Sequence, residues 1–317
     1  MVEIISKYQV PHSIFKNAFV NTSFARLFRP VKEVHYQREK LPTPDGDFID
    51  LDWSCVNSGS LVVLCHGFES SSKRIYVQSV VNALNAANYD VVVFNYRGCS
   101  GDLSKTYLIE VGQQEDMDVV IDKIIGEANY QKIHLVGYST GGNVVLRYLG
   151  LGANAVSDRL ASAYVVSPTL DLTTTIAELH EPKNRAYLFG FLIMLCKRLW
   201  QFRYNLPYDL DIFDLFKVRS FPDFFERFQK QYEKKTFAEY LEWNSSYKLI
   251  KDIAIPTAIL LAKDDPFVDY DSYPFEAATE NDNITLELSD YGGHVGFVDF
   301  DDGLFYSESR MLEYLAA

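Results

Sequence analysis

The stretch LVGYSTGG, residues 135–142, places a serine among glycines directly after a short apolar run. Glycine loses more backbone freedom on folding than any other residue, so closely spaced glycines weaken a regular element unless the backbone needs them. The sequence KIHLVG before the serine is typical of a strand, and GGNVVLRYL after it has the spacing of a helix. We therefore predict a sharp strand-to-helix turn with Ser139 at its apex.

Such a turn gives the pattern G-x-S-x-G a chemical meaning. Only small residues fit two positions before and two positions after the serine, here Gly137 and Gly141, and the turn presents the hydroxyl above the edge of the sheet. The N-terminus of the following helix leaves N–H groups unpaired and favours negative charge, as a developing oxyanion requires. The alternative is a glycine-rich turn with an incidental serine. The strand before it and the helix after it favour a nucleophile.

A serine nucleophile needs a base, and His294 is the best placed of the six histidines. It lies in the segment YGGHVG, residues 291–296, after the last predicted strand, where flanking glycines let a loop fold close to Ser139. The alternative is a surface histidine without a role. The others are placed less well: His12 and His35 precede the sheet, His134 falls within a strand, His180 falls in an inserted segment, and His66 follows a strand where we expect a structural role.

The acid that orients the histidine is expected at the end of the preceding strand, in AKDDPFV, residues 262–268. Asp264 and Asp265 compete for this role. Pro266 pushes the residue before it into an extended conformation, which suits a fixed carboxylate on a non-helical turn, so we choose Asp265. The resulting order along the chain, serine then aspartate then histidine, is the order of α/β-hydrolases.

The rest of the chain predicts an α/β fold. Residues 34–39 and 48–55 alternate apolar with polar side chains around the turn PTPDG and indicate an antiparallel hairpin. Unbroken apolar runs then alternate with helical patterns, which is typical of a parallel sheet covered by helices on both faces. The strands are expected at 61–65, 91–94, 133–136, 163–166, 257–262 and 284–288, and the helices at 75–87, 116–125, 143–149 and 304–315.

The alternation stops near residue 170 and resumes near 250. We predict a hydrolase core of residues 1–169 and 251–317, with a helical cap of residues 170–250 inserted in it, because a long insertion in a regular α/β domain is usually functional. Within the cap, the apolar block AYLFGFLIMLC, residues 186–196, has basic residues on both sides. It either packs against the cap's own aromatic residues or covers an acyl pocket above Ser139. Phe189 and Leu192 are its candidates for lining that pocket.

Composition excludes some classes of partner. The 317 residues carry 30 basic and 43 acidic side chains, a net charge of −13, which disfavours nucleic acid and anionic lipid as the main partner. The four cysteines show no paired spacing and are expected to be buried or free thiols in a reducing compartment, with one disulfide left open as the alternative. The start lacks the layout of a signal peptide, and the longest apolar run of eleven residues is too short to span a bilayer. We expect a soluble, cytoplasmic protein, with transient membrane contact through the cap left open.

Seven segments in order along the chain resemble the α/β-hydrolases, and within them the YheT-like branch related to the abhydrolase-domain lipid hydrolases. They are LPTPDGDFIDLDW, LCHGFESSS, NYRGCSG, GYSTGGN, VRSFPDFFERF, AKDDPFV and YGGHVGF. The resemblance implies hydrolysis of carboxylic esters without a cofactor, with Ser139, Asp265 and His294 at the triad positions. It also implies an oxyanion hole formed by the backbone N–H groups of Phe68 and Thr140. Thr140 stands where relatives usually carry leucine. We also expect no N-terminal membrane helix of the kind that is frequent in animal relatives.

These observations favour a serine hydrolase that cleaves short- to medium-chain or lipid-like esters through an acyl-enzyme. The alternatives are an amidase, peptidase or acyltransferase with the same triad and, in a different class, a non-catalytic ligand-binding protein of the same fold. Arg97, after a strand end, either borders the site or forms a structural ion pair. No metal site is expected, because the pair Asp264–Asp265 lacks further ligands and the DMD run at 116–118 is interpreted as a solvated helix start.

Overall fold

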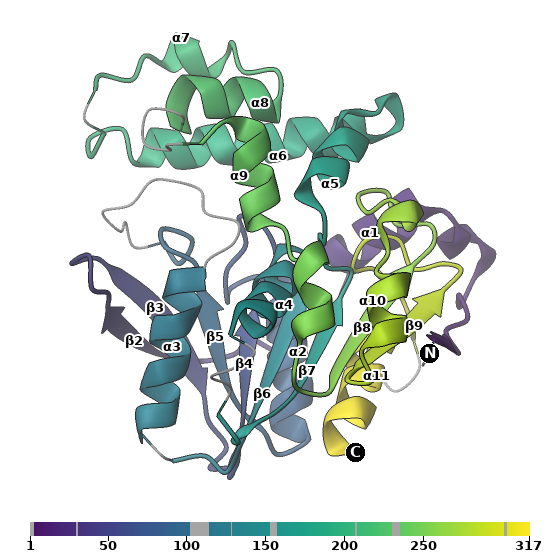
Figure 1. Ribbon diagram of the computed structural model, residues 1–317. Coiled ribbons are helices and arrows are strands. Elements are labelled where there is room, and N and C mark those ends of the chain that lie inside the picture. Colours follow the sequence, from purple (N-terminus) through teal and green to yellow (C-terminus); the bar gives the residue numbers. More distant parts are fainter. Residues whose placement is uncertain are drawn as a thin grey trace.

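The computed structural model describes residues 3–29, 31–101, 114–127, 129–152, 157–206, 208–229, 235–300 and 303–317. Within these ranges, nine strands form one sheet in the order β1-β9-β8-β7-β6-β4-β5-β3-β2 (Figure 1). The strands are β1 (Glu3–Ile5), β2 (Gln37–Pro42), β3 (Phe48–Ser54), β4 (Ser60–Cys65), β5 (Asp90–Asn95), β6 (Lys132–Tyr138), β7 (Leu160–Val166), β8 (Thr257–Ala262) and β9 (Ile284–Ser289).

The sheet is mostly parallel with an antiparallel start, as the sequence predicts. Strands β2 and β3 form the expected hairpin, with Pro42 opposite Phe48, and β3 runs antiparallel to β5. Strand β2 lies three residues later than predicted, because the turn begins only after Pro42. A proline is tolerated there because β2 is an edge strand, whose outer N–H groups need no partner in the sheet. Strand β1, which pairs in parallel with β9, is not predicted.

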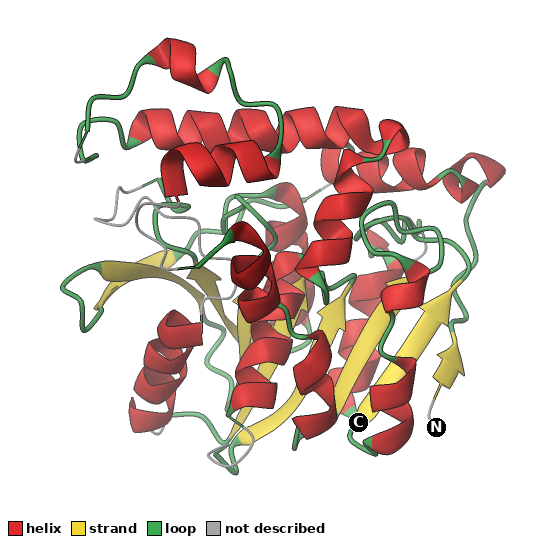
Figure 2. Ribbon diagram, turned by 45° about the horizontal axis from the view of Figure 1, so that its top comes forward, coloured by secondary structure: helices red, strands yellow, loops and turns green. Residues whose placement is uncertain are grey.

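Helices cover both faces of the sheet (Figures 1 and 2). Successive side chains of the apolar strands point to opposite faces of the sheet and enter two different cores. In β4, Leu61 and Val63 pack with residues of α3 and α4, whereas Val62 and Leu64 pack with residues of α2 and α11. The helices and helical turns of the core are η1 (Ser13–Lys16), α1 (Ala18–Leu27), α2 (Ile75–Ala86), α3 (Gln114–Glu127), α4 (Thr140–Leu151), η5 (Tyr270–Ser272), α10 (Phe275–Glu280) and α11 (Tyr306–Ala316).

The described residues between β7 and β8 contain helices and turns but no strand, and most of them lie beyond the end of the sheet where β6 and β7 finish (Figures 1 and 2). Their elements are α5 (Leu172–His180), η2 (Pro182–Asn184), α6 (Arg185–Gln201), α7 (Ile212–Leu215), α8 (Phe221–Phe224), η3 (Phe225–Gln229), α9 (Phe237–Asn244) and η4 (Tyr247–Asp252). Part of the predicted helical sequence, residues 230–234, lies outside the described residues. The division into core and cap at residues 170 and 250 stays a prediction.

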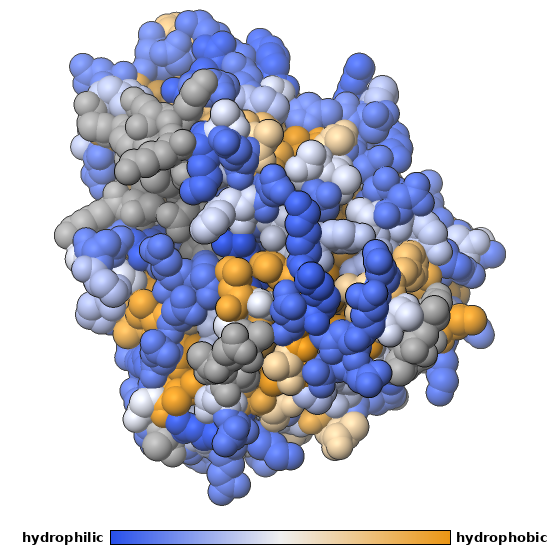
Figure 3. All heavy atoms as spheres, in the orientation of Figure 1, coloured by the Kyte–Doolittle hydropathy of each residue, from blue (hydrophilic) through white to orange (hydrophobic). Residues whose placement is uncertain are grey.

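The helical segment between β7 and β8 has an apolar cluster of its own. Leu192, Leu195 and Leu199 of α6 pack against Val218, Phe224 and Phe228, which follow later in the same segment. On the face of the molecule in Figure 3, hydrophilic side chains predominate and apolar ones lie between them in small groups. The segment is therefore held together by its own core, and its inner side faces the end of the sheet that carries Ser139.

Candidate active site

Ser139 lies at the junction of β6 and α4, and its backbone has φ 57° and ψ −124°, a conformation that residues other than glycine rarely adopt. The tight turn explains both glycines of the motif. A Cβ atom at position 137 would lie 2.5 Å from the carbonyl oxygen of Gly141, and one at position 141 would overlap the carbonyl oxygen of Cys65. The backbone N–H of Ser139 donates to Val166 O of the neighbouring strand (2.9 Å). The turn predicted from the sequence is thus present.

His294 lies between Ser139 and Asp265. Its Nε2 is 2.7 Å from Ser139 Oγ, and its Nδ1 is 2.9 Å from Asp265 Oδ2 and 3.2 Å from Asp265 Oδ1. The imidazole is almost completely buried, and so is the carboxylate that it contacts. The three side chains selected from the sequence therefore form one hydrogen-bonded series, although they are far apart along the chain.

Asp265 and Asp264 face different partners. Asp265 Oδ1 also accepts from the backbone N–H groups of Phe267 (2.8 Å) and Val268 (3.2 Å), which fixes the carboxylate beside the histidine. Asp264 Oδ1 accepts from the Gly293 N–H (2.8 Å), while its Oδ2 is buried without a partner among the described residues. Burial raises the pKa of Asp264 to about 6, although the Gly293 hydrogen bond opposes the shift. Only Asp265 contacts the imidazole.

The loop that carries His294 is held by the N-terminal segment of the chain, which sequence reasoning missed. The His294 N–H donates to Thr22 Oγ1 (2.9 Å), and the Val298 N–H donates to Asn21 Oδ1 (3.2 Å). Both side chains belong to α1. Gly293 has φ +56°, and a Cβ atom there would lie 2.5 Å from Thr22 Oγ1. The glycine thus allows α1 to pack directly against the histidine loop. No motif in the sequence marks Asn21 or Thr22.

The two residues whose backbone N–H groups are expected to bind an oxyanion line the pocket that contains Ser139. Thr140 is the first residue of α4, and N–H groups in the first turn of a helix have no acceptor within that helix. Phe68 follows β4 in the loop after His66-Gly67, and a Cβ atom at Gly67 would lie 3.4 Å from Ser139 Cβ. Phe68 and Thr140 line the same pocket as Ser139. This arrangement can surround a reacting carbonyl group with two backbone donors.

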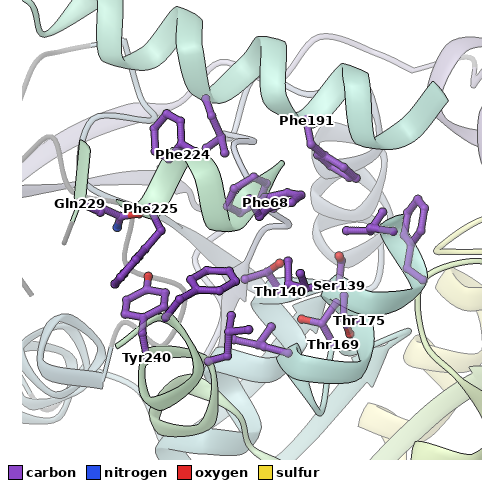
Figure 4. Close-up of a pocket in the computed structure, with 18 of the residues that line it drawn as sticks. Phe68, Ser139, Thr140, Thr169, Thr175, Phe191, Phe224, Phe225, Gln229 and Tyr240 are labelled. Atoms are coloured by element: carbon purple, nitrogen blue, oxygen red, sulfur yellow. The ribbon is translucent and has the colours of Figure 1, made fainter. Parts of the chain in front are cut away.

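A pocket of about 730 Å³, part of which is open to solvent, extends from Ser139 and His294 beneath the helices of the inserted segment (Figure 4). Most of its walls are apolar, and the aromatic side chains come from five parts of the chain. They are Phe68, Phe191, Phe221, Phe224, Phe225, Phe237, Tyr240 and Phe267. Such a pocket suits an apolar group more than a charged one.

The apolar block 186–196 forms most of α6 and contributes Phe191 and Leu195 to the pocket wall. The two residues selected from the sequence do not contribute. Phe189 points to the outside and is 67% exposed, and Leu192 is buried in the cluster of the inserted segment. Phe189 and Leu192 were only candidates, because sequence alone does not fix which face of an almost uniformly apolar helix points inward.

Arg97 forms structural ion pairs. Its Nε donates to Asp116 Oδ2 (2.9 Å), and its Nη1 lies 2.5 Å from Asp45 Oδ2, so it ties α3 to the hairpin turn. Asp116 is buried, so the interpretation of the DMD run as a solvated helix start was wrong for this residue. No group of three or more residues that could hold a metal ion occurs in the described ranges.

Two further titratable residues, His66 and Cys99, have pKa values that are shifted by burial. His66 is buried, its Nδ1 lies 2.9 Å from Gly67 O, and burial lowers its pKa to about 4. The four cysteines are free, as expected. Burial raises the pKa of Cys99 to about 12, which keeps its thiol protonated.

The fold, the serine turn and the apolar pocket define a class of protein. A family model described as alpha/beta hydrolase fold matches residues 60–301, and the chain belongs to this family. It is 29% identical over 300 residues to the putative esterase YheT of Escherichia coli, covering 91% of this chain and 86% of that protein. It is 28% identical over 282 residues to the mouse phospholipase ABHD3, covering 84% of this chain and 67% of that protein.

A solved structure shows the same fold. An esterase from Pyrococcus furiosus superimposes with a TM-score of 0.60 at 19% identity, covering 91% of this chain and 95% of that one. The relatives with esterase and phospholipase names support ester hydrolysis in general. Among the described residues, no helix has both the length and the apolar character needed to cross a membrane.

Proposed function

We propose that the protein is a carboxylic-ester hydrolase with Ser139 as nucleophile, His294 as general base and Asp265 as the group that orients the imidazole. The observation that carries the proposal is the unbroken series of contacts from Ser139 Oγ through the two nitrogens of His294 to Asp265, at 2.7 and 2.9 Å. The strained conformation of Ser139 supports it, because strain of this kind persists where the surrounding structure enforces it and clusters at active sites.

In the proposed mechanism, His294 Nε2 removes the hydroxyl proton as Ser139 Oγ attacks the ester carbonyl. The backbone N–H groups of Phe68 and Thr140 bind the oxyanion that forms on the carbonyl oxygen. The protonated imidazole, held by Asp265, then gives its proton to the leaving alcohol, and the acyl group remains on the serine. Water attacks the acyl-enzyme with the same base, which releases the carboxylic acid and restores the serine hydroxyl.

The proposed substrates are short- to medium-chain acyl esters or lipid-like esters. The aromatic and aliphatic walls of the pocket support this, since each methylene moved from water into such a pocket contributes about 0.8 kcal/mol. Residues 170–250 are proposed to act as the cap that supplies these walls, among them Leu195 and Tyr240. An amidase, a peptidase or an acyltransferase would use the same three side chains. A binding protein without catalysis would not need all three.

The test is a panel of p-nitrophenyl esters and the matching p-nitroanilides, from acetyl to decanoyl, incubated with purified protein. We expect hydrolysis of the esters with kcat/KM rising from acetyl toward mid-length chains, and much slower hydrolysis of the anilides. Faster anilide hydrolysis would replace the esterase by an amidase. No turnover of any substrate would contradict the proposal and favour a binding protein.

A further inference from the structure

Among the described residues, two buried hydroxyl groups in the wall of the pocket have no hydrogen-bond partner. The side chains of Thr169 and Thr175 line the pocket, each residue is only 5% exposed, and neither Oγ1 atom has a partner in the part of the chain that the structure describes. Nearly all buried polar side chains in proteins are paired, because an unpaired buried group loses its hydration without compensation. In a wall that is otherwise mostly apolar, two such groups indicate that something entering the pocket pairs with them.

The sheet brings the first hydroxyl, that of Thr169, to the same end of the pocket as Ser139. Tyr138 of β6 lies opposite Val166 of β7, and both strands run in the same direction. Ser139 follows the first strand by one residue and Thr169 follows the second by three, so both leave the same edge of the sheet in neighbouring positions. Figure 4 shows Ser139, Thr169 and Thr175 at one end of the pocket.

The second hydroxyl, that of Thr175, forms no hydrogen bond within its helix. Thr175 lies in α5, where a threonine hydroxyl can donate to a carbonyl oxygen of the preceding turn. The neighbouring Thr174 does so, with its Oγ1 3.0 Å from Asp171 O. Thr175 makes no such bond, although its backbone N–H donates to the same carbonyl group as an ordinary helical bond. Its hydroxyl therefore has no partner within the helix, although the residue lines the pocket.

We propose that Thr169 and Thr175 form a subsite that hydrogen-bonds an oxygen atom of the substrate within a few bonds of the scissile carbonyl. The preferred substrates are then esters with a second oxygen function, a hydroxyl, ether or carbonyl group, followed by an apolar chain. This inference rests on the proposed esterase function and adds a substrate class to it. A site with buried groups that pair with a substrate oxygen discriminates against an analogue without that oxygen, because binding the analogue leaves these groups unpaired.

The oxygen can belong to the acyl part or to the alcohol part of the ester, and two matched substrate pairs distinguish these sources. For the acyl part, p-nitrophenyl propoxyacetate is compared with p-nitrophenyl hexanoate, which has the same number of chain atoms. For the alcohol part, 2-methoxyethyl hexanoate is compared with n-butyl hexanoate by titration of the released acid. Each pair gives a ratio of kcat/KM values, and dividing the ratio of a variant by that of the wild type cancels the intrinsic reactivity of the two esters.

The variants are Thr169→Val and Thr175→Val, which keep the shape and remove the hydroxyl. Each variant is expected to lower the ratio of kcat/KM for the oxygenated ester to that for the oxygen-free ester about tenfold in one of the two pairs. Part of this change is expected to come from faster hydrolysis of the oxygen-free ester. Serine at either position is expected to preserve the preference. Thr173→Val is the matched control, since Thr173 is exposed on the same helix outside the pocket. The melting temperatures of the valine variants are expected to equal or exceed that of the wild type.

If a valine substitution changes kcat/KM equally for both esters of each pair, while the wild type still hydrolyses the plain esters, this inference is overturned. The proposed function would then remain intact. Absence of hydrolysis of all four esters by the wild type would instead overturn the proposed function. A valine variant that melts well below the wild type would show that its hydroxyl stabilises the fold, and the assignment of that residue to the subsite would then be wrong.

Discussion

Replacing Asp265 by asparagine tests how the imidazole is oriented. Asp265 Oδ1 accepts from the backbone N–H groups of Phe267 and Val268, so in the variant the carbonyl oxygen of the asparagine side chain keeps this position. Its NH₂ group then replaces Oδ2, the atom 2.9 Å from His294 Nδ1. An NH₂ donor in this place forces Nδ1 to accept a hydrogen bond, and the proton moves to Nε2. With Nε2 protonated, His294 cannot take the proton of Ser139.

The expected loss follows from this change of tautomer. In the best-studied serine protease triad, the same substitution leaves the geometry intact and lowers kcat about 10⁴-fold. At about 1.36 kcal/mol for each factor of ten, this corresponds to about 5.4 kcal/mol of transition-state stabilisation. Asp264→Asn is the matched control, because Asp264 contacts the Gly293 N–H and not the imidazole, and an asparagine oxygen accepts from that N–H equally well. We expect a loss of less than about tenfold for the control.

The assay is steady-state hydrolysis of p-nitrophenyl butyrate at pH 8 by both variants, with circular dichroism to verify folding. Asp265→Asn is expected to be slower than Asp264→Asn by at least two orders of magnitude. Equal losses, or a larger loss for Asp264→Asn, would refute the assignment of the orienting acid and with it the argument from Pro266.

Three further predictions follow from the same structure. Burial raises the folded-state pKa of Asp264 to about 6 from an ordinary 3.8, so this group lowers the stability of the fold progressively as the pH rises from 3.8 to about 6, and the full loss remains at higher pH. Asp264→Asn is therefore expected to raise the melting temperature at pH 8, and a gain that does not fade as the pH falls toward 3.8 would contradict this. For the wild type, kcat/KM is expected to rise about fourfold with each added methylene of the acyl chain. Leu195→Trp is expected to narrow the pocket and to shorten the chain length at which kcat/KM is highest, and an unchanged optimum would exclude binding of the acyl chain beside Leu195. Thr22→Val leaves the His294 N–H without its acceptor and is expected to lower kcat about tenfold, with Thr22→Ser near wild type; equal kcat in both variants would remove α1 from the site.

The local chemistry of the site is strongly encoded in the sequence. The pattern around Ser139 can be interpreted because a strand, a glycine-flanked serine and a helix in this order permit few backbone conformations, and the structure has the expected one. Asp265 was selected over Asp264 from one adjacent proline, and the structure places it against His294. These predictions depend on short-range geometry, which neighbouring residues determine.

The features that the sequence did not reveal depend on contacts between distant segments. Helix α1 supports the histidine loop through two side-chain hydrogen bonds across about 270 residues of chain, and no local pattern encodes such a pairing. The burial of Asp116 in α3 likewise depends on Arg97, which follows the end of β5. In α6, apolar residues cover most of the surface, so periodicity could not separate the pocket-lining Phe191 from the exposed Phe189. Tertiary packing decides these cases.

The most direct test of the central claim is covalent labelling by a fluorophosphonate probe, because only an activated serine reacts with it. Intact-mass analysis of the wild-type protein is expected to show one adduct per chain, and peptide mapping is expected to place it on Ser139. Ser139→Ala should remain folded and unlabelled, and His294→Ala should be labelled far more slowly than the wild type. An unlabelled wild-type protein, or equal labelling of the Ser139→Ala variant, would contradict the assignment of Ser139 as the nucleophile.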